Sequence, residues 1–141
     1  MERELSNSHT IHHRVRYSEC DRMGYLYHVN HFEFLEWGRT EWFRSKFMAY
    51  RDIEDKGYAV VVVDAKLRYL KPGYYDDLIS ITTRISNFKG SRFEFAYVIK
   101  RISDGAVICE AETSHCFVNK MGKPLKIFPE FKELLNSFSN Y

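Results

Sequence analysis

The sequence is poor in cysteine. Its 141 residues include only three, Cys20, Cys109 and Cys116, and none forms a C-x-x-C pair. An odd number of cysteines at irregular spacing argues against a disulfide framework. It fits thiols that stay reduced in a cytosol better.

Long apolar runs are also missing. No run approaches the ~18 residues that a membrane-spanning helix needs, and the first eight residues contain no apolar signal region. The sequence therefore predicts a cytoplasmic protein without a membrane span. No internal repeat or low-complexity segment interrupts the chain, so we expect residues 1–141 to form one domain.

Strong net charge is absent as well. The formal net charge is +2, and lysine and arginine are scattered along the chain, which argues against a nucleic-acid partner. Aromatic residues, in contrast, are abundant at 16%, with 11 Phe and 10 Tyr. We expect these rings to fill the core or to line an apolar site.

The first half of the chain predicts one strand and one long helix. After a loose end at residues 1–9, alternating apolar residues predict a strand over Ile11–Tyr17. A loop over Ser18–Tyr27 leads to helical spacing over residues 29–48, where Asn30 and the glutamate three positions later resemble a helix-start box. Gly38 costs about 1 kcal/mol against alanine inside such a helix, which favours a sheet packed close against it.

The second half predicts strands joined by short turns. After a polar, partly helical segment at 49–58, alternation predicts strands over Val60–Leu70, Leu78–Phe88, Arg92–Ser103 and Ala106–Val118, and residues 129–141 form a tail or short helix. Short turns require antiparallel neighbours, and a sheet with one apolar face needs a cover. The sequence therefore predicts an α+β domain whose five-stranded antiparallel sheet wraps around the long helix.

The stretch Tyr17–Arg39 places more potentially catalytic side chains beside large apolar ones than any other part of the sequence. We interpret it as an active-site loop that brings the carboxylate of Asp21 to the start of the helix. An aspartate is ordinarily ionised at neutral pH and can act as base or nucleophile. The unpaired N–H groups at a helix start can stabilise developing negative charge. The competing interpretation is that Asp21 only caps a turn.

These residues resemble a known family. The pattern Tyr17-x-Glu19-x-Asp21-x-x-Gly24-x-x-Tyr27-His28-x-Asn30, followed by Glu36-x-x-Arg39-x-Glu41, is similar to 4-hydroxybenzoyl-CoA thioesterase-like hotdog enzymes, including Tol–Pal-associated acyl-CoA thioesterases. The turns Tyr69-Leu70-Lys71-Pro72, Asp76-Asp77, Lys89-Gly90-Ser91 and Gly122-Lys123-Pro124 extend the resemblance over roughly residues 11–128.

The resemblance implies hydrolysis of an acyl-CoA thioester without a metal or redox cofactor. Asp21 would be base or nucleophile, the backbone N–H of His28 the oxyanion donor, and the side chains of Tyr17 and His28 would assist. Coenzyme A phosphates need basic groups, for which Lys89, Ser91 and Arg92 are the main candidates and Lys71 and Arg68 weaker ones, while Tyr27 and Asn30 are further substrate-binding candidates. The resemblance also implies a homodimer or homotetramer with sites at the subunit interface.

The sequence alone leaves several assignments open. Glu36 is a rival catalytic carboxylate on the helix, although an ion pair with Arg39 is the simpler role. Asp64 either approaches the site from a strand or lies on a polar face. His28 and His31 are spaced for a metal but lack a third ligand, and Cys20 is expected to be a packed thiol rather than a nucleophile. A hotdog enoyl-thioester hydratase and a catalytically idle acyl-CoA-binding module are the competing functions.

Overall fold

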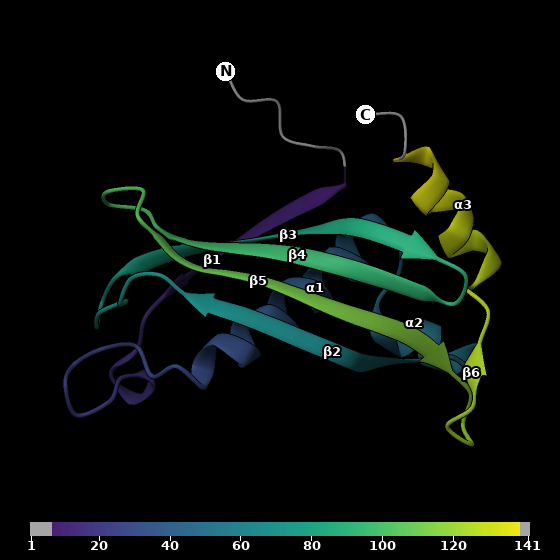
Figure 1. Ribbon diagram of the computed structural model, residues 1–141, viewed down its shortest axis with the longest axis horizontal. Coiled ribbons are helices and arrows are strands. Elements are labelled where there is room, and N and C mark those ends of the chain that lie inside the picture. The colour runs from purple at the N-terminus through teal and green to yellow at the C-terminus, as the bar shows by residue number, and fades with distance from the viewer. Residues whose placement is uncertain (1–6, 139–141) are drawn as a thin grey trace.

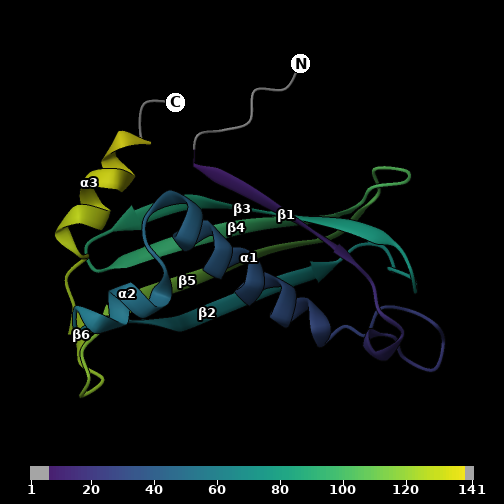
Figure 2. The same cartoon turned by 180° about the vertical axis from the view of Figure 1, so that it is seen from behind.

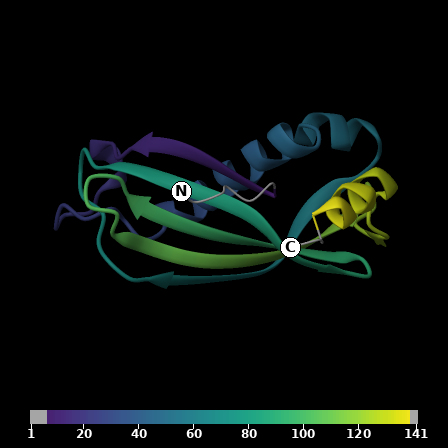
Figure 3. The same ribbon diagram turned by 90° about the horizontal axis from the view of Figure 1, so that it is seen from above.

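A single layer of antiparallel strands carries the long helix on one face (Figures 1 and 2). The computed structural model describes residues 7–138, and Figure 3 shows α1 lying to one side of the sheet. The elements in chain order are β1 (Ser8–Arg14), η1 (Tyr17–Glu19), α1 (Asn30–Lys46), α2 (Tyr50–Asp55), β2 (Ala59–Tyr69), β3 (Leu78–Lys89), β4 (Arg92–Arg101), β5 (Val107–Val118), β6 (Pro124–Leu125) and α3 (Pro129–Ser137).

The strand order confirms the predicted antiparallel α+β architecture. The strands run β1-β3-β4-β5-β2, with every neighbouring pair antiparallel. The predicted count of five strands was one short, because within residues 7–138 the sheet has six. The chain turns after β5 and pairs Pro124 and Leu125 with Val118 and Phe117. A strand of two residues has no alternation that a sequence pattern can reveal.

Aromatic side chains of α1 and the sheet make up much of the core. Trp42 and Phe43 of α1 are fully buried, and the Trp42 ring lies 4.9 Å from the ring of Phe95 on β4. Of the two alternatives left open for the tail, a helix forms over Pro129–Ser137, and its Phe131 contacts both α1 rings in the core. The aromatic excess therefore serves largely to pack α1 and α3 against the sheet.

Gly38 lies where α1 comes closest to the sheet, as the sequence predicted. A Cβ atom at Gly38 would lie 2.5 Å from Oγ1 of Thr83 and 3.1 Å from Cγ2 of Ile81, both on β3. The missing side chain therefore sets the distance between helix and sheet.

Gly38→Ala is expected to destabilise the fold. Overpacking of this kind costs about 1–3 kcal/mol, against a gain of about 1 kcal/mol in helix propensity. Urea unfolding should show a smaller cost in a Thr83→Ala background, because that change removes the nearest atom. An equal cost in both backgrounds would show that this contact is not the cause.

The first strand lies earlier in the chain than predicted. Ser8 and His9, expected in a loose end, pair with Arg84 and Thr83 of β3. The strand ends at Arg14, and Tyr17 belongs to the short η1 turn instead. The prediction was wrong because it followed apolar alternation, whereas the pairing is made by backbone groups that polar residues supply equally well.

The predicted helix-start box at Asn30 does not form. The first turn of α1 has no side-chain cap, and Nδ2 of Asn30 donates instead to the carbonyl oxygen of Glu19 at 2.8 Å. This bond crosses from the helix back to the preceding loop. Asn30 therefore fastens the helix to the loop rather than capping its own helix.

Candidate active site

A tight loop presents Asp21 at one end of the sheet. Cys20 and Leu26 form an isolated bridge, and the Asp21 N–H donates to the carbonyl oxygen of Tyr25 at 2.8 Å. Gly24 has a φ of 82°, a left-handed conformation that glycine adopts without strain. The loop thus closes on itself between the end of β1 and the start of α1.

The Asp21 carboxylate is both a turn acceptor and an available base. Its Oδ1 accepts hydrogen bonds from the N–H groups of Met23 at 2.9 Å and Tyr25 at 3.1 Å. Its second oxygen, Oδ2, makes no hydrogen bond to any residue between 7 and 138. The turn-capping role is therefore correct for one oxygen, and the second remains free for chemistry.

Asp21 and His28 line the same cavity, as predicted. The cavity has a volume of about 280 Å³, and its remaining lining residues are Tyr25, Leu26, His31, Tyr69, Leu70, Lys71, Pro72 and Gly73. Lys71, a weaker candidate for coenzyme A, is among them. Leu26 and Leu70 supply apolar surface, so the cavity combines an acid and an imidazole with apolar walls.

The backbone N–H of His28 is unpaired. Hydrogen bonds of the first turn run from the N–H groups of Asn30 and His31 to the carbonyl oxygens of Tyr27 and His28. No group in the described part of the chain accepts from the His28 N–H itself. An unpaired amide just before a helix is a ready donor to developing negative charge.

The carbonyl group of His28 is held from two sides. Nδ1 of His31 lies 3.0 Å from this oxygen, and the Tyr69 hydroxyl donates to it at 3.1 Å. His31 is buried, and burial lowers the pKa of its imidazole, which favours the neutral ring. Together these contacts fix the orientation of residue 28 at the cavity.

Tyr69→Phe is expected to loosen this orientation without unfolding the protein. Loss of one hydrogen bond costs about 0.5–1.5 kcal/mol, and His31 still holds the same oxygen. We expect turnover to fall about threefold to tenfold, in line with a cost of that size. Steady-state thiol release measures it, and Tyr75→Phe on the exposed surface serves as the control.

Glu19 organises the site, a role that sequence reasoning missed. Its carboxylate lies 2.8 Å from Nε2 of buried His13 and accepts from the Arg16 N–H at 2.7 Å. Its carbonyl oxygen accepts from the Tyr27 N–H and from Asn30, both at 2.8 Å. The acid belongs to the quoted motif, but no periodic pattern pairs it with a histidine six residues earlier.

Three predicted site residues near Asp21 in the sequence do not line the cavity. The Tyr17 side chain is 82% exposed, and its ring stands 5.5 Å from that of Tyr75. Tyr27 is exposed and packs its ring against His28 at 4.8 Å without lining the cavity. Asn30 is engaged with the loop, so its amide is structural here. Within one chain, only Asp21 and His28 of the predicted catalytic set come together.

The predicted coenzyme A residues lie at the opposite end of the sheet. Lys89 pairs with Arg92 at the β3–β4 turn, whereas the loop before α1 lies at the other end of the sheet (Figure 1). Pro72, which lines the cavity, is bonded to Arg101 at the far end of β4. The ten residues of β4 span about 30 Å at the usual rise. Ser91 lines a separate cavity of about 920 Å³ near α3. Lys89, Ser91 and Arg92 therefore do not line the Asp21 cavity of their own chain, and their role in binding coenzyme A stays a prediction.

The rival carboxylates do not reach the cavity. Glu36 is exposed on α1, and Asp64 is exposed on β2 beside a strand irregularity. The expected ion pair between Glu36 and Arg39 does not form in the described part of the chain. Arg39 is buried and donates to the Tyr97 hydroxyl at 3.3 Å. Arg39 turns inward because α1 places it over the sheet.

The surroundings of Cys20 do not favour a cysteine nucleophile. Burial, and then the nearby carboxylates of Glu19 and Asp21, raise the pKa of the Cys20 thiol, which disfavours the thiolate. Among residues 7–138, no group of three or more histidine, cysteine, aspartate or glutamate side chains is placed to hold a metal ion.

No helix in the same range is long and apolar enough to cross a membrane.

Comparisons with known proteins identify the family of the chain. Residues 15–135 match the model of the thioesterase-like superfamily. The chain is 28% identical over 125 residues to the acyl-CoA thioester hydrolase YbgC of Escherichia coli O6:H1, covering 85% of this chain and 92% of that protein. A hypothetical protein of Aquifex aeolicus with a solved structure has 31% identity and a TM-score of 0.83, covering 90% and 98% of the two chains.

A more distant structure supports the fold. The 4-hydroxybenzoyl-CoA thioesterase of Pseudomonas sp. strain CBS-3 has a TM-score of 0.85 at 19% identity, covering 92% of this chain and 99% of that one. The expected hotdog fold is therefore confirmed.

Proposed function

Because the chain belongs to the thioesterase-like superfamily, we propose that it is an acyl-CoA thioesterase. It would hydrolyse an acyl-CoA to a carboxylic acid and free coenzyme A. The observation that carries the proposal is one cavity lined by both the Asp21 carboxylate and His28, whose backbone N–H has no acceptor in the described chain. A thioesterase needs these two groups at the same carbonyl.

The proposed reaction uses only groups of this chain and water. The free oxygen of Asp21 takes a proton from water while the hydroxide adds to the thioester carbon. The His28 N–H donates to the oxygen that becomes negative. Collapse of this intermediate breaks the C–S bond, and the departing thiolate takes the proton. In the nucleophilic route Asp21 instead adds directly to the carbon, the C–S bond breaks and the coenzyme A thiolate leaves, which gives a mixed anhydride. Water then cleaves this anhydride to the acid and the free Asp21 carboxylate, and the proton released from water goes to the thiolate. Neither route requires a metal or redox cofactor.

We propose that the active protein is a homodimer or homotetramer. Within residues 7–138, strand β2 pairs only with β5, which leaves its second edge open, and Val62 and Val63 on it are exposed. Open edges of this kind favour pairing with another chain. Since Lys89, Ser91 and Arg92 lie far from their own Asp21, any role for them in binding coenzyme A requires a second copy.

A panel of acyl-CoA thioesters of different length, together with an aromatic one, tests the function. Thiol release is followed with a chromogenic thiol reagent. We expect turnover on at least one member of the panel. Stoichiometric binding without thiol release would instead identify an idle acyl-binding module. Hydration of an enoyl-CoA without loss of the thioester would identify a hydratase.

A further inference from the structure

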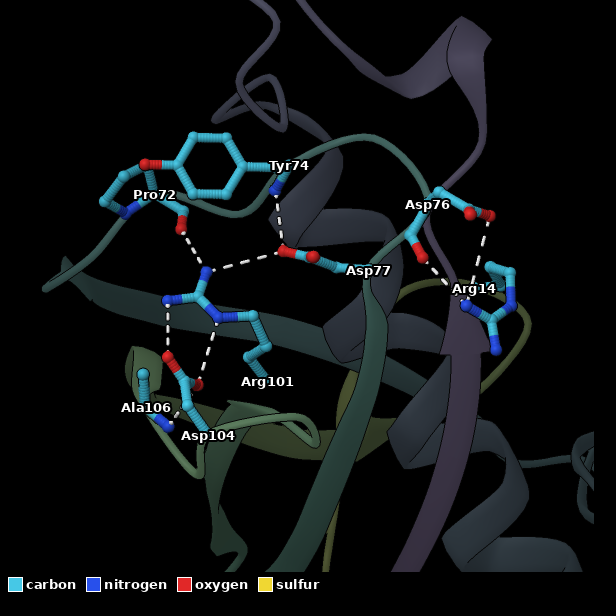
Figure 4. A network of polar contacts seen from close by, with 8 residues as sticks. All are labelled: Arg14, Pro72, Tyr74, Asp76, Asp77, Arg101, Asp104 and Ala106. Carbon is cyan, nitrogen blue, oxygen red and sulfur yellow. Dashed lines mark hydrogen bonds and ion pairs between the residues drawn. The ribbon is translucent and has the colours of Figure 1, made fainter.

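Arg101 lies at the centre of a polar network beside the cavity (Figure 4). Its Nη1 donates to the carbonyl oxygen of Pro72 at 3.0 Å and to Oδ2 of Asp77 at 3.4 Å. Its Nε and Nη2 donate to the carboxylate of Asp104 at 3.0 and 3.2 Å. The side chain is only 13% exposed. One guanidinium thus joins the β4–β5 turn to the segment that follows β2.

That segment forms one wall of the Asp21 cavity. Leu70, Lys71, Pro72 and Gly73 all line it, and none of them belongs to a strand or helix. The N–H groups of Leu70 and Lys71 both donate to the carbonyl oxygen of Ile108. Among the described residues, the side-chain hydrogen bond to residues 70–73 comes from Arg101.

Two contacts connect this wall of the cavity to the loop that contains Asp21. The carbonyl oxygen of Gly73, next to the residue that Arg101 holds, accepts from the Leu26 N–H at 2.7 Å. Tyr74 forms an isolated bridge with Tyr25, and their rings stand 5.6 Å apart. The first contact thus reaches Leu26 and the second reaches its neighbour Tyr25, both in the loop that contains Asp21.

Arg101 supports the second contact as well as the first. Its guanidinium carbon lies 5.6 Å from the centre of the Tyr74 ring, within reach of a cation–π contact. The Tyr74 N–H donates to the same Asp77 oxygen that Arg101 approaches, at 2.9 Å. The neighbouring loop residue, Tyr25, donates its N–H to Oδ1 of Asp21.

We propose that Arg101 is a positioning residue for catalysis, which holds the Asp21 carboxylate in place through Gly73–Leu26 and Tyr74–Tyr25. This inference rests on the proposed function of Asp21. An arginine suits the task because its planar fork donates in several directions at once, whereas a lysine is a single point charge. Arg101 touches no reacting atom and acts only through the wall and the loop.

The activity test compares Arg101→Gln with Arg14→Gln. Arg14 is the matched control because it holds the same segment at Asp76, donating to its carbonyl oxygen at 2.8 Å (Figure 4). Asp76 lies beyond the residues that line the cavity. We expect Arg101→Gln to lower kcat about 10- to 100-fold, as for a misplacement of about 1 Å, with KM changed much less. Arg14→Gln should keep kcat within about twofold of the wild type.

A second measurement does not depend on activity. Amide hydrogen exchange of a peptide spanning residues 21–27 reports the Leu26 N–H and its neighbours. We expect exchange about tenfold faster in Arg101→Gln than in the wild type, and unchanged exchange in Arg14→Gln. Circular dichroism checks that each variant is folded. If Arg101→Gln does not fold, the milder Arg101→Lys is measured, with the same changes expected at smaller size.

The two proposals fail in different ways. A folded Arg101 variant with wild-type kcat and exchange would overturn the role of Arg101 and leave the proposed function standing. Equal losses in the Arg101 and Arg14 variants would also overturn it. A wild-type protein that cleaves no thioester would overturn the proposed function, and the exchange data alone would then decide whether Arg101 positions the loop.

Discussion

Asp21→Asn is expected to lower thiol release by at least about 10³-fold, within the range for loss of a catalytic base. Asparagine has nearly the same shape, and its side-chain oxygen can still accept from the N–H groups of Met23 and Tyr25, as Oδ1 of Asp21 does. The loop should therefore keep its conformation while the negative charge is lost. Steady-state kinetics on the best acyl-CoA of the panel measures the effect.

Glu36→Gln is the matched control for this loss. Glu36 lies on α1, is exposed and does not line the Asp21 cavity. Its removal should leave kcat within about threefold of the wild type, the usual range for a surface change. The assignment fails if Asp21→Asn turns over normally while Glu36→Gln is inactive. In that case the base would lie on the helix.

Stability is expected to fall steeply in acid because of His115. This imidazole is fully buried, close to the Thr113 hydroxyl and the carbonyl oxygen of Val61. Burial, and then the charge of Arg39, lower its pKa from 6.5 to about 3. Below pH 6.5 the unfolded chain binds a proton that the folded chain refuses, so acid favours unfolding.

The expected size follows from that shift. From this group alone, the free energy of unfolding should drop by about 2 kcal/mol between pH 7.5 and pH 5, and by about 4 kcal/mol near pH 3. His115→Gln is less stable at neutral pH but should lose this part of the pH dependence. Urea unfolding at the two higher pH values measures both effects.

His12→Gln, which changes an exposed histidine of β1, is the control for the acid effect. Its pH dependence should match that of the wild type. An unchanged slope in His115→Gln would show that different groups cause the acid sensitivity. Burial of His31 lowers the pKa of that imidazole too, so part of the slope should persist in every variant that keeps it.

Most of the fold was predictable because its elements have local signatures in the chain. Alternation placed β2 to β5 within one or two residues of their observed ends. Gly38 indicated the close approach of helix and sheet from the sequence alone. The misplacement of β1 and the missing β6 have one cause: β1 is defined by backbone pairing with β3, and β6 by backbone pairing with β5. Backbone pairing leaves no mark on side-chain periodicity.

The site was only half predictable. Asp21 and His28 were found because a motif and a helix start lie side by side in the chain. The contacts that hold them join Glu19 to His13, Tyr69 to His28 and Arg101 to Pro72. The last two pairs are far apart in sequence, and no local spacing predicts which polar groups meet. Tyr17 shows the reverse error, since nearness in the chain did not bring it into the cavity.

The sequence by itself determined the kinds of element, their order, and the acid and amide proposed for the chemistry, because these depend on periodicity and on neighbours along the chain. Only the tertiary structure decided that the Lys89–Arg92 turn lies at the wrong end of the sheet for its own Asp21. It also brought Arg101 into hydrogen-bonding distance of Pro72 in the cavity wall. Strand pairing fixes such distances, and a strand of ten residues carries its two ends about 30 Å apart.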